Sequence, residues 1–302
     1  MDPTPGRLVT QPPGLPPGFT CQQIAQNPSV VLSAPFPTGA QPNDYPCLPD
    51  TVAWANLMSE LGMAVAPTAM HPARTTGYGG FALSLEAAFT HINSNAVAGG
   101  LQYWRAGTQG PSGPDPYIQV YSLHARKGLP YGLEVAATAG YVAKTTLWVW
   151  GADARWAVLE GYRSGFLGAL PDIAVGGGVR TLSGASTFGL TTLGIEGELS
   201  KPFPFRDGPV LTPYLEAQRV VIFADSGAVD LTPSAADSEG TSFGRARIQR
   251  WRAIGGLDYR YEVLSLSAEF AMDMTAPSAE NAGIGVSGDR QWTVSIAAGV
   301  VF

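Results

Sequence analysis

The fold is decided by residues 290–302, RQWTVSIAAGVVF, in which two kinds of residue alternate. Every second residue from Trp292 to Phe302 is apolar, whereas the positions from Gln291 to Gly299 that lie between them are small or polar. Successive side chains of a β-strand point to opposite faces. The stretch is therefore predicted to form a strand with one apolar and one polar face.

The same period of two continues back through the chain as far as Thr75. Ten strands are predicted, over residues 77–92, 117–127, 131–142, 146–160, 172–182, 187–200, 211–224, 247–261, 263–274 and 290–302. Three of them are less regular. The strand at 117–127 has no clean face, the strand at 187–200 changes parity near Thr191 as a bulge would, and the strand at 211–224 points Arg219 outward.

Residues 1–74 have a different character, and we expect them to form a separate segment before a barrel or sandwich at 75–302. The first 50 residues are rich in proline and lack periodicity, which is typical of extended or loop-like chain. Apolar residues at helical spacing predict a short helix near 51–64, capped by Asp50 or Thr51 and ended before Pro67.

Two cysteines, Cys21 and Cys47, lie 26 positions apart in this segment. With no histidine or CxxC spacing nearby they make a poor metal site. We expect them to form a disulfide, which an oxidising compartment would permit; unpaired thiols are the alternative. The chain opens on Met1-Asp2-Pro3 without the basic and apolar regions of a signal peptide, so it is either cytosolic or the mature form of an exported protein.

The composition excludes several classes. Only 14% of the 302 residues are charged, the net charge is −6, and the mean hydropathy is only +0.06. An aromatic content of 10% argues against a disordered chain, and an acidic pI near 5.1 argues against nucleic-acid binding. No run of about 20 apolar residues is present.

Aromatic residues favour a membrane barrel over a soluble sandwich. On the apolar faces they stand in pairs near the two strand ends, eight to ten residues apart, which corresponds to about 20–25 Å along the membrane normal at the usual strand tilt. That is close to the separation of the two aromatic girdles of an outer-membrane barrel. The girdle residues are Phe81, Phe89, Tyr131, Tyr141, Trp148, Trp156, Trp251 and Tyr259.

Loop lengths agree with this interpretation. If both termini face the periplasm, the three longest connections, near 93–116, 225–246 and 275–289, all lie on the opposite, outer side. Short periplasmic turns and long external loops are typical of outer-membrane barrels.

Residues 75–302 resemble bacterial outer-membrane β-barrels as a class, because the last strand ends in an aromatic residue preceded by alternating apolar ones. The resemblance implies an outer-membrane location after removal of a signal peptide, contact with outer-membrane lipid, and recognition by the barrel-assembly machinery through Trp292, Val300 and Phe302. A secreted β-sandwich stays open as the alternative.

If the apolar faces of the strands point outward to lipid, the charged residues that alternate with them point into the lumen. They include Glu86, Glu134, Asp153, Arg155, Arg180, Glu196, Glu198, Glu216, Arg250, Arg252, Asp258, Arg260, Glu269 and Asp273. Because buried charges must pair or meet water, we expect a network of arginine–carboxylate pairs that fills the barrel, with a narrow water or ion path as the alternative. The helix near 51–64 is a candidate plug for the periplasmic mouth.

The function expected from this pattern is a structural anchor or an interaction protein, with periplasmic or envelope proteins as partners of residues 1–74. A narrow channel for small solutes or ions is the second hypothesis. A surface hydrolase is the third, because Ser122 and His124 share a strand face near Glu86 and Glu134. No spacing matches a lipase or protease pattern, so we predict no catalytic residue, metal or cofactor.

Overall fold

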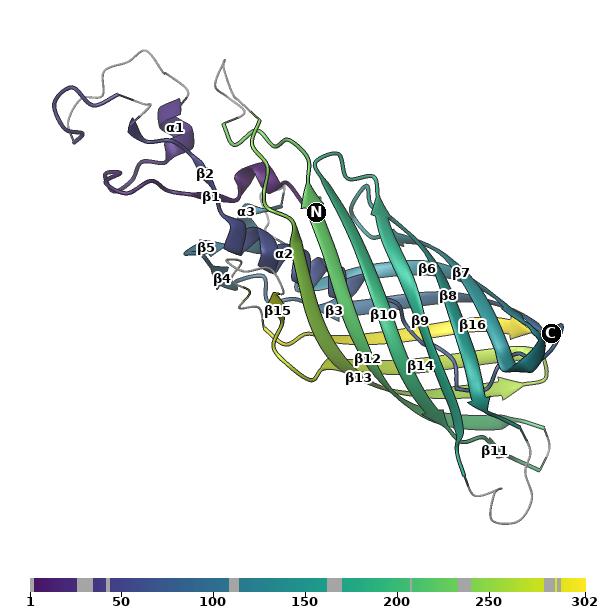
Figure 1. Ribbon diagram of the computed structural model, residues 1–302. Coiled ribbons are helices and arrows are strands. Elements are labelled where there is room, and N and C mark those ends of the chain that lie inside the picture. The colour runs from purple at the N-terminus through teal and green to yellow at the C-terminus, as the bar shows by residue number, and fades with distance from the viewer. Residues whose placement is uncertain are drawn as a thin grey trace.

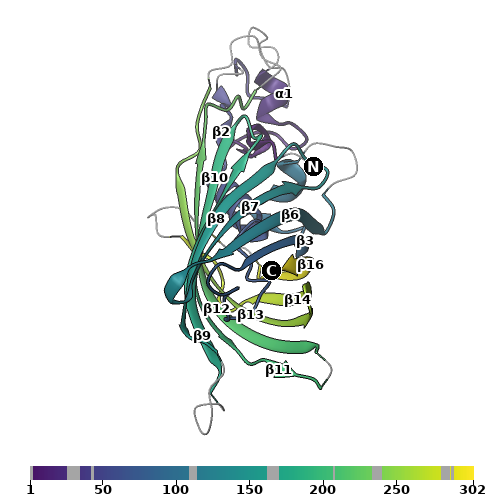
Figure 2. The same cartoon turned by 90° about the vertical axis from the view of Figure 1, so that its right-hand side faces the viewer.

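In the computed structural model, ten antiparallel strands close into a barrel (Figures 1 and 2). The structure describes residues 3–25, 35–41, 44–108, 114–161, 170–206, 208–232, 240–279, 286 and 289–302. The barrel strands are β3 (Phe81–His91), β6 (Tyr117–Gly128), β7 (Leu133–Val142), β8 (Trp148–Leu159), β9 (Asp172–Ser183), β10 (Phe188–Ser200), β12 (Val210–Ser226), β13 (Ala246–Tyr261), β14 (Leu264–Asp273) and β16 (Trp292–Val301).

Each barrel strand pairs with its neighbour in the sequence, and β16 returns to β3 to close the sheet, for example at Ile296 opposite Ala87. This topology confirms the predicted ten-stranded barrel and excludes the sandwich, whose two sheets would have open edges. On the outer surface Leu85 and Ile296 are 67% and 55% exposed, whereas the adjacent inward Glu86 is 5% exposed. Apolar side chains outside and charged ones inside are the pattern of a transmembrane barrel.

The two ends of the barrel differ. The long-loop end carries the connections 92–116, 143–147, 184–187, 227–245 and 274–291, which include β4 (Val97–Ala98), β5 (Leu101–Gln102), α3 (Tyr103–Ala106) and β15 (Ser278–Ala279). The short-turn end carries 129–132, 160–171, 201–209 and 262–263, with η3 (Pro130–Gly132) and β11 (Phe203–Pro204). Phe302 also lies at the short-turn end, where its backbone pairs with that of Phe81.

The N-terminal segment lies beyond the long-loop end (Figure 1). Its elements are η1 (Pro5–Arg7), β1 (Val9–Thr10), α1 (Cys21–Ala25) and β2 (Leu48–Pro49), and β1 pairs with β2. The predicted disulfide between Cys21 and Cys47 is present, with 5.4 Å between the Cα atoms.

This position differs from the expected one. We expected residues 1–74 and Phe302 on the same side of the membrane, with the helix at the periplasmic mouth. Instead the helix, α2 (Thr51–Ala64), lies inside the long-loop end, and the chain then runs down the lumen to reach β3 at the opposite end (Figure 1). Asp50 caps α2 by accepting a hydrogen bond from the Ala53 amide at 2.8 Å.

Among the described residues, no helix has the length and apolarity needed to span a membrane.

Two local expectations are wrong in detail. Thr191 marks no bulge, because β10 pairs continuously with both neighbours; the irregularity in register lies between Ala157 and Leu159 of β8. Tyr131 lies in the turn before β7, with a φ of 65° and 91% exposure, rather than on a strand face. Arg219, in contrast, does face outward, as the sequence pattern indicates.

Candidate functional site

The lumen is occupied by the chain itself, because residues 65–80 cross it between α2 and β3. The Pro67 carbonyl accepts hydrogen bonds from Gln218 of β12, at 3.2 Å, and from Arg252 of β13. Further down, Thr68 donates to Glu86 of β3 at 3.0 Å, and the Met70 amide donates to Glu269 of β14 at 2.9 Å. The crossing chain is thus hydrogen-bonded to four strands in its first half.

The second half of the crossing is held in the same way. The Ala73 amide donates to Ser200 Oγ at 3.1 Å, and Arg74 pairs with Asp172 at 3.0 Å. The Thr75 amide donates to Glu160 at 2.9 Å, close to the short-turn end. Buried backbone groups without partners are costly, so these wall side chains fix the path of the segment.

Paired charges fill the wall around this segment. Arg180 forms two bonds with Asp153, at 2.8 and 2.9 Å. Glycine makes room for this pair, because a Cβ at Gly178 would lie 1.8 Å from Asp153 Oδ1 and one at Gly151 would lie 2.4 Å from Arg180 Cδ. The run of glycines in β9 therefore accommodates buried side chains that face the lumen.

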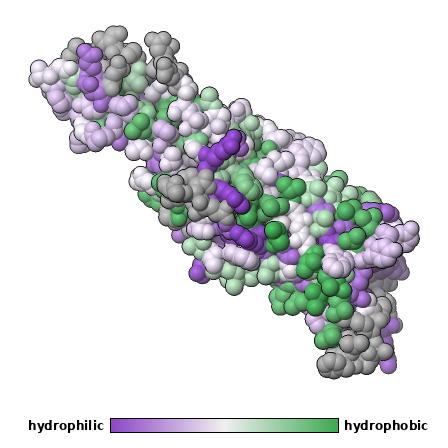
Figure 3. Space-filling model, in the orientation of Figure 1, coloured by the Kyte–Doolittle hydropathy of each residue, from purple (hydrophilic) through white to green (hydrophobic). Residues whose placement is uncertain are grey.

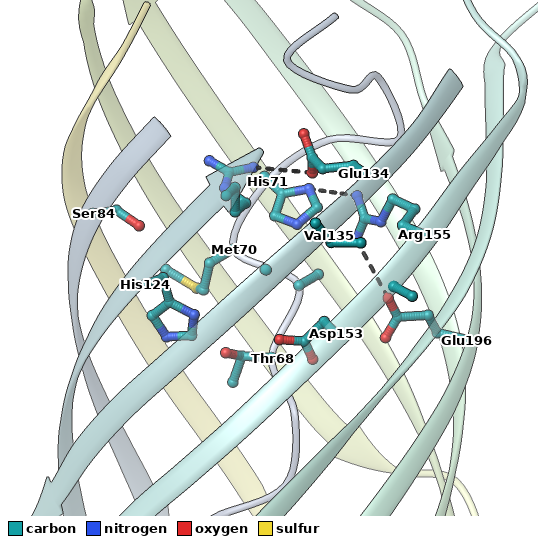
Figure 4. A pocket seen from close by; sticks show the side chains of 14 residues that line it. Thr68, Met70, His71, Ser84, His124, Glu134, Val135, Asp153, Arg155 and Glu196 are labelled. Atoms are coloured by element: carbon teal, nitrogen blue, oxygen red, sulfur yellow. Dashed lines mark hydrogen bonds and ion pairs between the residues drawn. The ribbon is translucent and has the colours of Figure 1, made fainter. Parts of the chain in front are cut away.

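Arg155 is the centre of a second cluster (Figure 4). Its guanidinium lies 2.9 Å from Glu198 and 3.4 Å from Glu196, and it also contacts His71 of the crossing segment. The cavity beside them has a volume of about 20 Å³, which is room for about one water molecule.

The structure places most of the other predicted lumen charges on the inward face as well. Those that are less than a tenth exposed are Glu86, Glu134, Glu216, Arg250, Arg252, Asp258, Glu269 and Asp273. Arg260 differs, because it is exposed at the rim of the short-turn end, where its Nε donates to the Glu262 carbonyl.

His124 belongs to a hydrogen-bonded cluster whose geometry differs from that of a serine triad. Ser122 Oγ, at 3.0 Å, and Glu86 Oε2, at 2.7 Å, both contact Nε2 of His124, while Thr138 contacts Nδ1 at 3.1 Å. In a triad the nucleophile and the acid contact opposite ring nitrogens. Thr138 and Glu86 do so, but the adjoining cavity of about 20 Å³ has no room for a substrate. The cluster is therefore suited to holding the wall together.

At the long-loop end the inward side chains are apolar and pack on α2. Trp54 stacks on Phe243 with ring centroids 5.1 Å apart and meets Phe188 edge-on at 6.0 Å. A Cβ at Gly62 would lie 2.6 Å from Ile222. The inward apolar residues of this ring are Ile118, Val120, Val142, Val149, Leu182, Phe188, Leu190, Val220, Ile222 and Ile248.

A buried polar contact locks α2 to the loop above it. The Glu60 carboxylate, which is fully buried, accepts hydrogen bonds from the Tyr103 hydroxyl and, at 2.5 Å, from Trp104 Nε1, both on α3. Burial raises the pKa of Glu60 to about 7, although the two hydrogen bonds lower it. Burial and the nearby Glu60 also raise the pKa of Tyr103.

The N-terminal segment rests on the same loops. The Thr4 amide donates to the Gly107 carbonyl at 2.7 Å, and Gln22 Nε2 donates to the Leu231 carbonyl at 3.0 Å. Between segment and loops lies a cleft of about 930 Å³. Its polar lining includes Arg7, Arg105 and Asp230.

Several residues that build the site do not stand out in the sequence. Arg126 and Asp172 are buried in the lumen, but the first lies on a strand without a clean face and the second at a strand end. Glu60 lies on a helix whose twelve residues from Ala53 to Ala64 are all buried. An acidic residue within that nearly uncharged helix is the one signal that could have marked it.

The aromatic girdle residues other than Tyr131 lie on barrel strands, and Phe81, Trp148, Trp156, Trp251 and Tyr259 are 39–49% exposed. In the terminal strand β16, Trp292 contacts Phe270, with centroids 6.3 Å apart, and Phe302 is 68% exposed.

No family model matches the chain, and no curated protein matches it in sequence. Solved structures similar to it include OprG of Pseudomonas aeruginosa, at 16% identity over 76% of this chain and 99% of that one, with a TM-score of 0.29. They also include the N-terminal β-barrel domain of OprF of Pseudomonas aeruginosa, at 12% identity over 73% of this chain and 97% of that one, with a TM-score of 0.28. Ail, the attachment invasion locus protein of Yersinia pestis, is similar at 12% identity over 74% of this chain and 99% of that one, with a TM-score of 0.27. The likeness extends to the β-barrel class of bacterial outer-membrane proteins and to nothing narrower.

Proposed function

We propose that the protein is an outer-membrane anchor that closes its own lumen and holds its N-terminal segment at the cell surface as a contact site. The observation that carries this proposal is the passage of residues 65–80 through the barrel. Gln218 donates a hydrogen bond to this passage, and Glu86, Glu269 and Ser200 accept hydrogen bonds from it along its length.

The orientation follows from the connections. In outer-membrane barrels the long connections face the medium and the short turns face the periplasm. The N-terminal segment packs on the long connections, so it lies outside the cell in this orientation, and the disulfide between Cys21 and Cys47 suits that oxidising environment.

The contact surface is the cleft between the segment and the loops. Arg7 and Arg105 present donors there, and Asp230 presents an acceptor. This surface is built from two parts of the chain, so a bound partner would also hold the segment in place.

Planar-bilayer recording tests the closed lumen. We expect the purified full chain to give no single-channel steps under conditions in which a porin conducts, because residues 65–80 occupy the lumen and the cavity beside Arg155 at mid-lumen holds about one water molecule. A variant that lacks residues 1–74 is the matched comparison, because steps that appear only in that variant identify the segment as the closure. Regular conductance steps from the full chain would contradict the anchor and favour a narrow channel.

A further inference from the structure

Two arginines lie on the lipid-facing side of the barrel, where charge is otherwise rare. Arg219 of β12 and Arg247 of β13 alternate with the inward Val220 and Ile248, so both point outward. An arginine exposed to lipid is costly at the centre of the membrane and nearly free of cost at its edge. The depth of the two arginines in the membrane therefore decides how much their exposure costs and whether they can reach the lipid headgroups.

The register places both at the long-loop edge of the apolar band. Tyr259 and Trp251 of β13 are eight residues apart, which spans about 20 Å along the normal and corresponds to the two girdles. Arg219 lies directly opposite Trp251. Arg247 lies four residues beyond Trp251, which is about 10 Å further out. This depth is that of the lipid headgroups.

Aromatic rings hold both guanidinium groups against the barrel. Cζ of Arg219 lies 5.9 Å from the centroid of Trp251, and Cζ of Arg247 lies 5.5 Å from the centroid of Phe223. Val221, between them on this face, is only 6% exposed, which shows that neighbouring side chains cover it.

Other polar groups continue the surface. Arg219 donates to Gln249, which faces outward between Trp251 and Arg247. Figure 3 shows strongly hydrophilic side chains in a row beside apolar ones, on the face that β12 and β13 form in Figure 1. Asp225 and Arg245 follow towards the loops, one acid and one base, so the residues of this surface that the structure describes carry a net positive charge.

We propose that this surface, Arg219, Gln249 and Arg247 with Trp251 and Phe223, binds the phosphate of an anionic lipid headgroup in the outer leaflet. A guanidinium presents paired donors that match phosphate oxygens, and the rings orient it at headgroup depth. The proposal rests on the membrane orientation proposed above but not on the closed lumen, so a conducting full chain would leave it standing.

Native mass spectrometry of the full chain in detergent micelles tests it. The probes are dioleoyl phosphatidic acid, which carries a phosphomonoester, dioleoyl phosphatidylcholine, which carries no net charge, and inorganic phosphate. We expect phosphatidic acid to bind at least about tenfold more tightly than phosphatidylcholine, and the double variant R219Q/R247Q to lose that preference. R206Q/R260Q removes two exposed arginines at the short-turn end, away from this surface, and is expected to keep the preference.

A folding control and a competition experiment complete the test. Heat-modifiable gel mobility reports whether each variant is folded; if the double variant is not, R247Q alone, at an exposed position, is expected to weaken binding at least about threefold. Wild-type-like preference for phosphatidic acid in R219Q/R247Q, or in a folded R247Q where that variant replaces it, would overturn the proposal. Competition by inorganic phosphate as effective as that by the lipid would also overturn it, because the site would then take free anions.

Discussion

We expect the Glu60→Gln substitution to remove a pH dependence from the contact that holds α2 in the barrel mouth. Glu60 is buried and accepts hydrogen bonds from Tyr103 and Trp104. In the variant, the amide oxygen can accept from Trp104 while the amide nitrogen donates to the Tyr103 oxygen, so that each polar group keeps a partner.

The magnitude follows from the pKa. Burial raises the pKa of Glu60 from 4.5 to about 7, so the docked helix binds the proton more tightly than the released helix does. The stability of docking is therefore highest below about pH 4.5, falls as the pH rises, and levels off above about pH 7. The difference is 2.5 pKa units, or about 3 kcal/mol.

Hydrogen exchange in detergent measures this difference directly. Protection factors of the α2 amides, corrected for intrinsic exchange, are expected to fall by roughly two orders of magnitude between pH 4.5 and pH 8 in the wild type. They are expected to stay level in E60Q. The matched control is E160Q, at the opposite end of the lumen, which is expected to keep the wild-type profile. Identical pH profiles for wild type and E60Q would refute the reasoning.

Three further substitutions test the packing. Gly62→Ala brings a methyl group to 2.6 Å from buried Ile222, and the thermal unfolding midpoint should fall by the equivalent of about 1–3 kcal/mol; an unchanged midpoint would show that α2 does not pack there. Arg155→Met leaves the Glu198 carboxylate buried without its partner, so the free energy of unfolding measured in urea should fall by about 3–5 kcal/mol. An unchanged free energy of unfolding would mean that this pair is not formed. Cys21→Ser opens the disulfide and should speed proteolysis of the N-terminal segment while leaving the heat-modifiable mobility of the barrel unchanged; loss of that mobility would contradict the separation of the two parts.

Most of the barrel could be predicted because lipid and lumen impose opposite chemistries on alternate residues. The predicted strands 172–182 and 187–200 differ from β9 and β10 by one residue at one end each. The inward charges follow from the same alternation, because a side chain such as Glu198 has nowhere else to lie once the apolar face meets lipid.

Two irregularities in the predicted strands share one physical cause, which is the helix inside the mouth. Ile118, Val120 and Leu190 face inward and pack on α2 rather than on lipid. A strand with apolar residues on both faces has no clean face, as at 117–127, or appears to change parity, as near Thr191. The alternation of apolar and polar residues shows only which faces of a strand are apolar. It cannot show whether an apolar face contacts lipid or a buried helix.

The side on which the N-terminal segment lies is not encoded in periodicity at all. It depends on long-range contacts such as those of Thr75 with Glu160 and of Glu60 with Trp104. Neither pair follows a spacing rule, so the path through the lumen becomes visible only in three dimensions.

The central claim is that the N-terminal segment and the short turns lie on opposite sides of the membrane. Epitope tags inserted at two exposed, left-handed glycines test it: Gly14 in the segment, with a φ of 83°, and Gly208 in the turn between β11 and β12, with a φ of 110°. On intact cells, antibody is expected to label the Gly14 tag and to reach the Gly208 tag only after the outer membrane is permeabilised. Labelling of the Gly14 tag only after permeabilisation would contradict the account.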